Sequence, residues 1–249
     1  MRWLLAVAVA ATPAITTPTQ PSFPGPARTP AGGKLALVLV SSRYHPPGAE
    51  TVESTAAVSN PPRVPGAHLV KIIPRRGGHL LTYGKDPGSA RYVLGVNTEG
   101  GVQYGFDLRN YVWPPRIAPG EREFVYEQIV WAQEAGGVLY VENAHLTYAK
   151  SSYGRNAYIT AFNLKTRKPL WRSPALVANA NEFVVAGNVI VTGYGFTAAP
   201  DYLYLLDRRT GRVLDRLGLP TMAEQIVRHG STFSVRTYDH YVVAKLVRS

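Results

Sequence analysis

Apolar and polar residues alternate along two stretches of the chain that also resemble each other. Residues 157–171 read AYITAFNLKTRKPLW, and residues 202–215 read YLYLLDRRTGRVLD. Alternation with a period of two predicts β-strands, because successive side chains of a strand point to opposite faces of a sheet. Asn163 and Asp207 each open a short polar turn that is typical of a hairpin. The repeated element is therefore a strand, a turn and a second strand.

The repeat also extends toward the N-terminus of each stretch. Residues 127–130 and 224–227 both read EQIV, and residues 182–185 read EFVV. A glycine turn and another apolar strand follow each of these segments. A further copy runs from residue 68 to residue 108. Each complete unit thus contains four strands, and no sustained helical periodicity interrupts them.

A four-stranded sheet with two apolar faces needs a neighbouring sheet on each side, which explains why the unit is repeated. Tyrosines near the end of the second strand recur at spacings of 65, 46 and 44 residues. The last two spacings are near the ~40–50 residues of a propeller blade, and the first unit contains a longer insertion around Trp113. We therefore predict an all-β fold, a β-propeller of four-stranded antiparallel blades. The blades number four, or five if residues 42–66 form a degenerate one.

The apolar strand LALVLV at residues 35–40 has no blade of its own. One interpretation is that it completes the last sheet, which would otherwise present an exposed edge, and so closes the propeller. The alternative is that it belongs to a degenerate first blade.

The motif around the last two strands of the unit is similar to the repeat of quinoprotein-dehydrogenase-like (PQQ-repeat type) propellers. The family repeat ends in Asp/Asn-x-x-Thr-Gly-x-x-hydrophobic-Trp. One copy here has Trp171 but Arg167 in place of the glycine, and the other has Gly211 but Asp215 in place of the tryptophan. The match is best over residues 124–220. The resemblance implies a propeller in which Trp171 packs between neighbouring blades.

The dehydrogenases of that family hold a quinone cofactor over a tryptophan and a pair of adjacent cysteines, with calcium beside it. This chain contains no cysteine, and we cannot place a calcium-binding carboxylate set on it. We therefore expect no cofactor and no metal, and a non-catalytic branch that resembles the outer-membrane assembly propeller proteins. The lack of cysteine also excludes a disulfide framework and a cysteine nucleophile.

The N-terminal residues differ in composition from the rest of the chain. Residues 1–14 combine a positive start, an apolar run and small residues, which predicts a signal peptide, although an uncleaved apolar start is the alternative. Residues 15–33 are rich in proline and threonine and are expected to form a linker, followed by a propeller domain over residues 34–249. No segment beyond the signal peptide is apolar enough to span a bilayer. The protein is therefore expected to be secreted, or to lie in the periplasm or cell envelope.

The formal charge of +11 favours anionic partners. Basic residues gather on the two quoted hairpin turns, which should be neighbours on one face of the propeller: Lys165, Arg167, Lys168, Arg208, Arg209 and Arg212. This basic rim contacts an anionic polymer or consists simply of solvated turns. No specific nucleic-acid-binding motif is present.

Three glutamates recur where the first strand of a unit begins: Glu127, Glu182 and Glu224. First strands lie innermost in a propeller, so these side chains could converge in the central channel. Carboxylates that meet there would raise each other's pKa unless a cation lies among them. They form a cation or amine site, or each one caps its own blade.

The recurring tyrosines are Tyr83, Tyr148, Tyr194 and Tyr238. They line a loop face that binds a partner, or they pack between blades with the hydroxyl at the edge.

These features predict a binding or scaffolding module for a protein or an anionic envelope component. The alternative is a propeller hydrolase or lyase that acts on a polysaccharide through channel carboxylates such as Glu127 and Glu224. The two functions predict different surroundings. An enzyme needs two carboxylates that face each other across an open pocket, whereas a binding module has them paired with arginines or loop amides.

Overall fold

The computed structural model describes residues 13–22, 24–28, 35–47, 57–114, 117, 119–197 and 199–248. These residues form seventeen β-strands and three short 3₁₀ helices, η1 (Arg109–Tyr111), η2 (Pro119–Glu121) and η3 (Ala149–Ser152). Within these ranges, no helix has the length and apolarity needed to cross a bilayer. The strands make four sheets, which confirms the predicted all-β propeller of four-stranded antiparallel blades.

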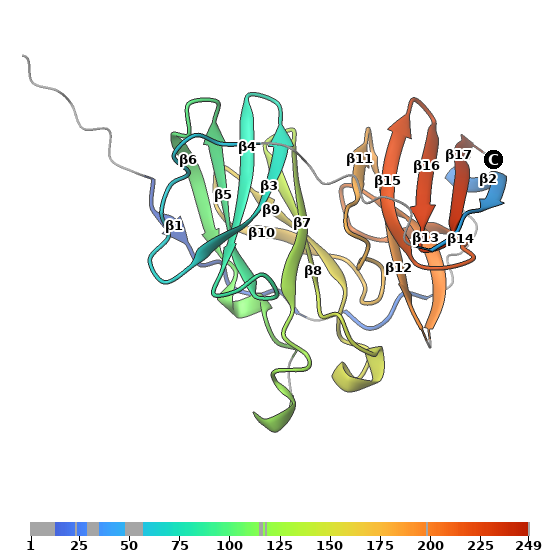
Figure 1. Ribbon diagram of the computed structural model, residues 1–249, viewed down its shortest axis with the longest axis horizontal. Coiled ribbons are helices and arrows are strands. Elements are labelled where there is room, and N and C mark those ends of the chain that lie inside the picture. The colour runs from blue at the N-terminus through green and yellow to red at the C-terminus, as the bar shows by residue number, and fades with distance from the viewer. Residues whose placement is uncertain are drawn as a thin grey trace, which may run out of the picture.

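The blades follow one another along the chain, and blades 1 to 3 are each a meander of four consecutive strands (Figure 1). Blade 1 contains β3 (His68–Arg75), β4 (Gly78–Gly84), β5 (Ala90–Asn97) and β6 (Val102–Asp107). Blade 2 contains β7 (Gln128–Ala135), β8 (Val138–Ala144), β9 (Tyr158–Asn163) and β10 (Pro169–Arg172). Blade 3 contains β11 (Val184–Ala186), β12 (Val189–Phe196), β13 (Ala199–Asp207) and β14 (Val213–Gly218). Blade 4 contains β15 (Ala223–His229), β16 (Thr232–Thr237), β17 (His240–Arg248) and β2 (Leu35–Tyr44).

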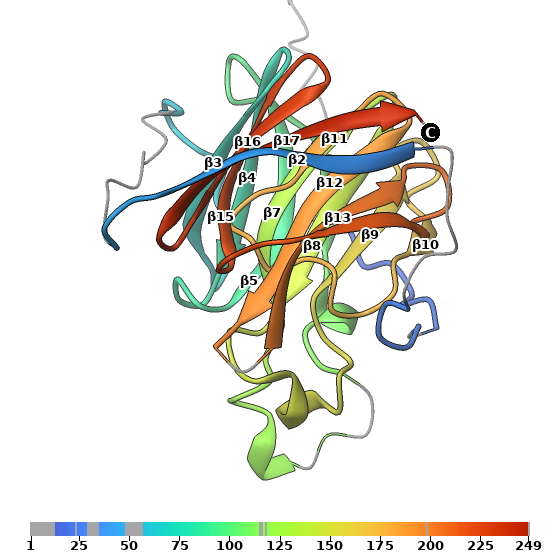
Figure 2. The ribbon, with the colours of Figure 1, turned by 90° about the vertical axis from the view of Figure 1, so that its right-hand side faces the viewer.

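The strand β2 supplies the outer strand of blade 4, although about 180 residues separate it from β15 in the sequence. It pairs antiparallel with β17 along its length, from Leu35 opposite Arg248 to Tyr44 opposite His240, and Figure 2 shows the two strands side by side. The interpretation that this strand completes the last sheet is confirmed, and the alternative of a degenerate first blade is wrong. A main-chain ladder thus ties the start of the domain to its end.

Apolar side chains fill three seams between successive blades. One cluster joins blades 1 and 2, with Phe106 against Phe162, and a second joins blades 2 and 3. A third cluster joins blades 3 and 4, and here Leu37 packs with Phe233 and Leu205. The other face of blade 1 is covered by residues 57–67. Among the described residues, no apolar cluster joins blade 4 with blade 1.

The stretch expected to be a linker lies against the outer edges of blades 1 and 2 where the structure describes it. The two-residue strand β1 (Ile15–Thr16) pairs parallel with β6. Further along, the side-chain amide of Asn110 donates to the carbonyl of Pro18 at 3.0 Å, and Ala27 N donates to the carbonyl of Ala175 at 2.9 Å. The described part of this stretch therefore runs from the outer edge of blade 1 to that of blade 2.

In a meander, successive connections alternate between the two ends of the sheet, so each blade has two distinct ends. We call the turn end the end that carries the hairpin turns between the first two and the last two strands of a blade, which include residues 135–138, 163–169 and 207–213. The opposite loop end carries the longer connections, which include residues 108–127 and 145–157. Figure 1 shows the β3–β4 and β15–β16 turns above the sheets and the longer loops below them.

Trp171 ties blade 2 to the turn of blade 3, as the family resemblance implied. Its indole N–H donates to the carbonyl of Arg208 at 3.1 Å, and its ring fills the space beside Gly211. Gly211 has φ +70°, which favours glycine, and a Cβ there would lie 2.4 Å from the indole, which requires it.

Replacing Trp171 by alanine is expected to lower the free energy of unfolding by about 3 kcal/mol, because the seam loses a large ring and the Arg208 carbonyl loses its donor. Urea unfolding measures this cost. The matched control is Trp113→Ala in the 108–127 loop, where the ring is partly exposed, and a loss of under about 1 kcal/mol is expected. Equal losses for the two variants would contradict the role of Trp171 in the seam.

Candidate functional site

The strand register shows that the three recurring glutamates do not occupy equivalent positions. Counted from the glycine turns, Glu224 takes the place that Val130 has in blade 2, and Glu182 takes the place of Trp131. Glu127 lies further out, before β7 begins. The letters EQIV match, but Glu127 lies nine residues before Gly136 whereas Glu224 lies six residues before Gly230, so the two copies differ by three residues in register.

Two of the three glutamates meet around Arg236. Glu224 Oε2 forms an ion pair with Arg236 Nη1 at 2.7 Å. Glu182 Oε1 accepts a hydrogen bond from the backbone N–H of Ile226 at 2.9 Å, which links blade 3 to blade 4. Burial raises the pKa of Glu182, while the Ile226 amide, Lys71 and Arg236 act against that shift. Both carboxylates are therefore held by groups of the fold itself.

A second charged group, which the sequence reading missed, lies where blades 1, 2 and 3 adjoin. Lys71 Nζ donates to the carbonyl of Val130 at 2.9 Å and lies over the Trp131 ring. Burial lowers the pKa of Lys71, and the nearby charges of Glu142 and Glu182 oppose this. The detectable signal was a charge inside an apolar strand, as in HLVKII (68–73) and VLYVENA (138–144).

Glu142 is fully buried in β8, and neither of its carboxylate oxygens has a hydrogen-bond partner in the structure. Burial raises its pKa, and the positive charge of Lys71 partly offsets the rise. These groups therefore comprise one ion pair, Glu224–Arg236, two charges held by backbone groups, Lys71 and Glu182, and the buried carboxyl of Glu142.

Glu127 lies apart from this group, in the interior of blade 2. It is fully buried, and burial raises its pKa to about 8 against the opposing positive charge of Arg172. The Arg172 guanidinium lies between the rings of Tyr111 and Tyr158, with its Cζ 4.8 Å and 4.4 Å from the ring centres. Glu127 and Glu224 thus have separate cationic neighbours. They do not form the pair across an open pocket that glycoside hydrolysis requires.

The recurring tyrosines divide into two kinds. Tyr83 and Tyr194 are buried, and the Tyr83 hydroxyl donates to the carbonyl of Pro62 at 2.6 Å. Tyr148 and Tyr238 are 51% and 55% exposed at the loop end. Tyr148 packs edge-on against Phe196 of the next blade, with ring centres 5.1 Å apart. The two buried tyrosines have a packing role, and the two exposed ones are available to a partner.

Other large apolar side chains are exposed on the same loops or beside them. They lie on the 108–127 loop, the 145–157 loop and the end of β2: Trp113, Phe124, Leu146, Tyr153 and Tyr44. Tyr44 is near Tyr238 because β2 ends opposite His240, at the start of β17. We call these exposed side chains, together with Tyr148 and Tyr238, the aromatic surface of the loop end.

The residues of the basic rim also divide into two kinds. Arg208 connects blades 2 and 3. Its guanidinium donates to the Tyr140 hydroxyl at 2.8 Å and to the carbonyls of Gly187 and Ala135. Arg167 likewise lies over the Tyr104 ring of blade 1, 5.2 Å from its centre. The remaining four are exposed on the turns: Lys165, Lys168, Arg209 and Arg212.

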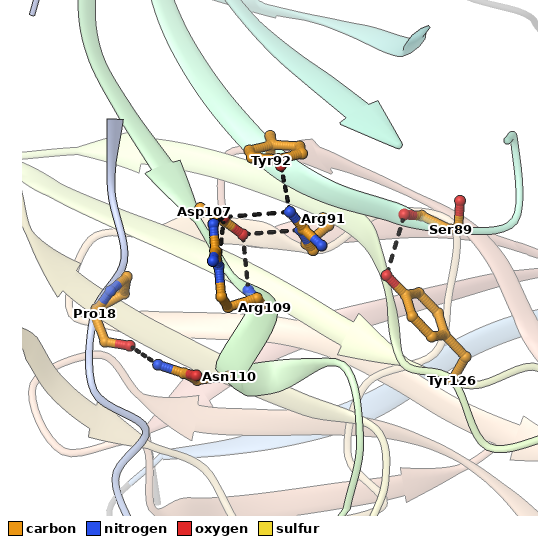
Figure 3. Close-up of polar contacts among 8 residues, drawn as sticks. All are labelled: Pro18, Ser89, Arg91, Tyr92, Asp107, Arg109, Asn110 and Tyr126. Carbon is orange, nitrogen blue, oxygen red and sulfur yellow. Dashed lines mark hydrogen bonds and ion pairs between the residues drawn. The ribbon is translucent and has the colours of Figure 1, made fainter. Parts of the chain in front are cut away.

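A separate hollow of about 560 Å³ lies at the loop end of blade 1, where Lys85, Arg91 and Tyr126 contribute to its lining. The buried Asp107 carboxylate holds both Arg91, at 2.9 Å, and Arg109 (Figure 3). Arg91 also stacks on the Tyr92 ring and contacts its hydroxyl. The Arg91 charge beside the hollow is thus paired with Asp107. In the part of the chain that the structure describes, no group of three His, Asp or Glu side chains could hold a metal ion.

Comparison with known proteins gives structural neighbours only. No family model matches the chain, and no curated protein does. Among solved structures, the computationally designed Ika8 protein is 9% identical with a TM-score of 0.48. The match covers 72% of this chain and 46% of the Ika8 chain. The designed Ika4 protein is 10% identical with a TM-score of 0.47, covering 73% of this chain and 92% of its own. BamB from Moraxella catarrhalis is 12% identical with a TM-score of 0.39, covering 76% of this chain and 61% of its own. The chain thus spans about half the length of Ika8.

Proposed function

We propose that this protein is a binding scaffold whose loop end captures a partner protein. The observation that carries the proposal is the aromatic surface of the loop end, where Tyr148 and Tyr238 are more than half exposed. Aromatic side chains on a rigid support are the residues that contribute most at protein interfaces. The Tyr148–Phe196 contact gives such support, because it fixes one ring against the next blade.

The surroundings of the glutamates support binding rather than hydrolysis. Glu224 is paired with Arg236, and Glu182 accepts a backbone amide. Glu127 is buried beside Arg172 and out of reach of an external substrate. These are the surroundings that a binding module was expected to show, and they offer no exposed acid–base pair.

The proposal includes the place where the protein acts. The leader-like composition of residues 1–14 supports export to the periplasm, the cell envelope or the medium. The partner is then a protein of the same compartment, and the test below is done in envelope and medium fractions of the native host.

The test places a photoreactive benzoylphenylalanine at Tyr148 or Tyr238 and, as a control, at Val227, which is also exposed but lies on the face of blade 4. Irradiation is expected to give the same discrete protein adduct from both loop-end positions and none from Val227. The substitution Leu146→Asp, beside Tyr148, is expected to lower the adduct yield at least about fivefold, as for an interface anchor. Equal adduct yields from all three positions, or a yield that Leu146→Asp does not change, would refute the proposal.

A further inference from the structure

A groove lies at the turn end, between the outer parts of blades 2 and 3, far from the loop-end aromatics. Its volume is about 550 Å³, within the range of ligand sites in proteins. Blade 2 contributes β8 and β10 residues, and blade 3 contributes the Asp207–Arg209 turn and Asn188. The groove is therefore a product of the blade seam and does not belong to one hairpin alone.

The floor of the groove is apolar and rigid. Trp171, Tyr140 and Val138 line it, and Leu170 beside them is 52% exposed. Trp171 is fixed by its hydrogen bond to the Arg208 carbonyl, and Arg208 is fixed by the Tyr140 hydroxyl. A side chain that enters the groove would thus meet a preformed surface, which reduces the entropic cost of binding.

The rim of the groove is cationic. Arg209 lines the groove, and Lys165, Lys168 and Arg212 lie on the same two turns. Within the described residues, none of these four takes part in an ion pair. The one acid in the lining is Asp207. Its carboxylate accepts hydrogen bonds from the backbone N–H groups of Arg209 and Thr210 at 2.9 and 2.8 Å, and so stabilises the turn.

We propose that this groove binds an acidic segment of a partner protein, with one apolar side chain of the segment seated against Leu170 and Trp171. Negative residues on either side of that anchor would face Arg209 and Lys168. The apolar floor favours a peptide over a nucleic-acid duplex or another simple polyanion, which would use the cations alone. A single-stranded nucleic acid could stack a base on Trp171, so binding of polyuridylate is one of the outcomes measured below. The protein would then hold two partners, one at each end of the propeller. This second site stands independently of the loop-end proposal.

The probe is a fluorescein-labelled peptide of twelve residues, in which a central Leu-Phe pair is flanked by aspartates and glutamates. Fluorescence anisotropy with the full chain is expected to show saturable binding that weakens as salt is raised, because surface charges are screened. Replacing Leu-Phe by Ser-Ser in the peptide should weaken binding about tenfold, which corresponds to one buried apolar anchor. Replacing the acids by lysines should abolish it.

Two protein variants locate the site. Arg209→Glu and Leu170→Asp are each expected to weaken binding of the acidic peptide about tenfold. The matched control is Lys85→Glu, the same loss of positive charge on the loop-end side of blade 1, which should change the affinity less than about twofold. Circular dichroism confirms that each variant is folded before binding is measured.

Three results would overturn the proposal: no binding of the acidic peptide, binding that ignores Leu170→Asp, or equal affinity for the Ser-Ser peptide and for polyuridylate. The last result would indicate a polyanion surface in place of a peptide site. Cross-linking from Tyr148 at the loop end distinguishes failure of this proposal from failure of the proposed function, because Arg209→Glu should leave that adduct unchanged.

Discussion

Replacing Leu37 by aspartate is expected to lower the free energy of unfolding by about 4 kcal/mol or more, since the change removes a core side chain and buries a charge. Leu37 is 5% exposed and packs in the cluster that joins blades 3 and 4. Its backbone N–H donates to Asp215 Oδ2 at 2.7 Å, so the new carboxylate would also lie near an existing one. Urea unfolding followed by tryptophan fluorescence measures the loss.

The next residue of the same strand supplies the control. Val38 is 47% exposed, because successive side chains of β2 point to opposite faces of blade 4. Val38→Asp is therefore expected to change the free energy of unfolding by less than about 1 kcal/mol. Equal costs at the two positions would mean that β2 does not lie on the blade 4 core in the way the structure has it.

Replacing Glu127 by glutamine is expected to make the protein markedly more stable at pH 8 and to have little effect at pH 5. Burial raises the pKa of Glu127 to about 8, whereas in an unfolded chain a glutamate has a pKa near ~4.3. Between these values the folded state keeps a proton that the unfolded state has released. The free energy of unfolding therefore falls as pH rises, by on the order of 1 kcal/mol per pH unit from this one group.

The measurement is urea unfolding of both proteins at several pH values from 5 to 8. Burial also raises the pKa values of Glu142 and Glu182, so the variant should retain some of the slope. The difference between the two profiles isolates Glu127, and it should widen as pH rises. Glu121→Gln, at an exposed position in the 108–127 loop, is expected to run parallel to the wild type. A parallel profile for Glu127→Gln would contradict the burial of a protonated carboxyl.

Most of the fold could be predicted because hairpins carry local signals. The turn that starts at Asp207 is fixed by short-range hydrogen bonds that its carboxylate accepts from the amides of Arg209 and Thr210, and Gly211 has a positive φ. Alternation then sets which side chains of each strand face a neighbouring blade. The pairing of β2 with β17 is long-range, so the apolar run at 35–40 left two interpretations open until the register was known.

The candidate site was harder to predict, because it depends on register and on contacts between blades. Both first strands carry a register shift at the equivalent residue, Val130 and Glu224. The letters EQIV nevertheless begin nine residues before the glycine turn in blade 2 and six before it in blade 4, which places Glu127 and Glu224 in different registers. In the same way, Arg208 and Arg209 are neighbours in the sequence, yet the Arg208 side chain bonds to Tyr140 of blade 2 and the Arg209 side chain is exposed. Composition alone treats both arginines as one basic rim.

A cross-link between β2 and β17 tests the central claim most directly, because the natural chain has no cysteine to compete. Val38 lies opposite Lys245 in the ladder, and residues so paired have Cβ atoms about 4.5–5.5 Å apart, within reach of a disulfide after a small shift. The double variant Val38→Cys with Lys245→Cys, treated with a mild oxidant, should form an intramolecular disulfide and remain folded. The pair Val38→Cys with Lys85→Cys, which joins blade 4 to blade 1, should remain reduced. A reduced first pair, or equal oxidation of both, would contradict a last blade completed by the first long strand.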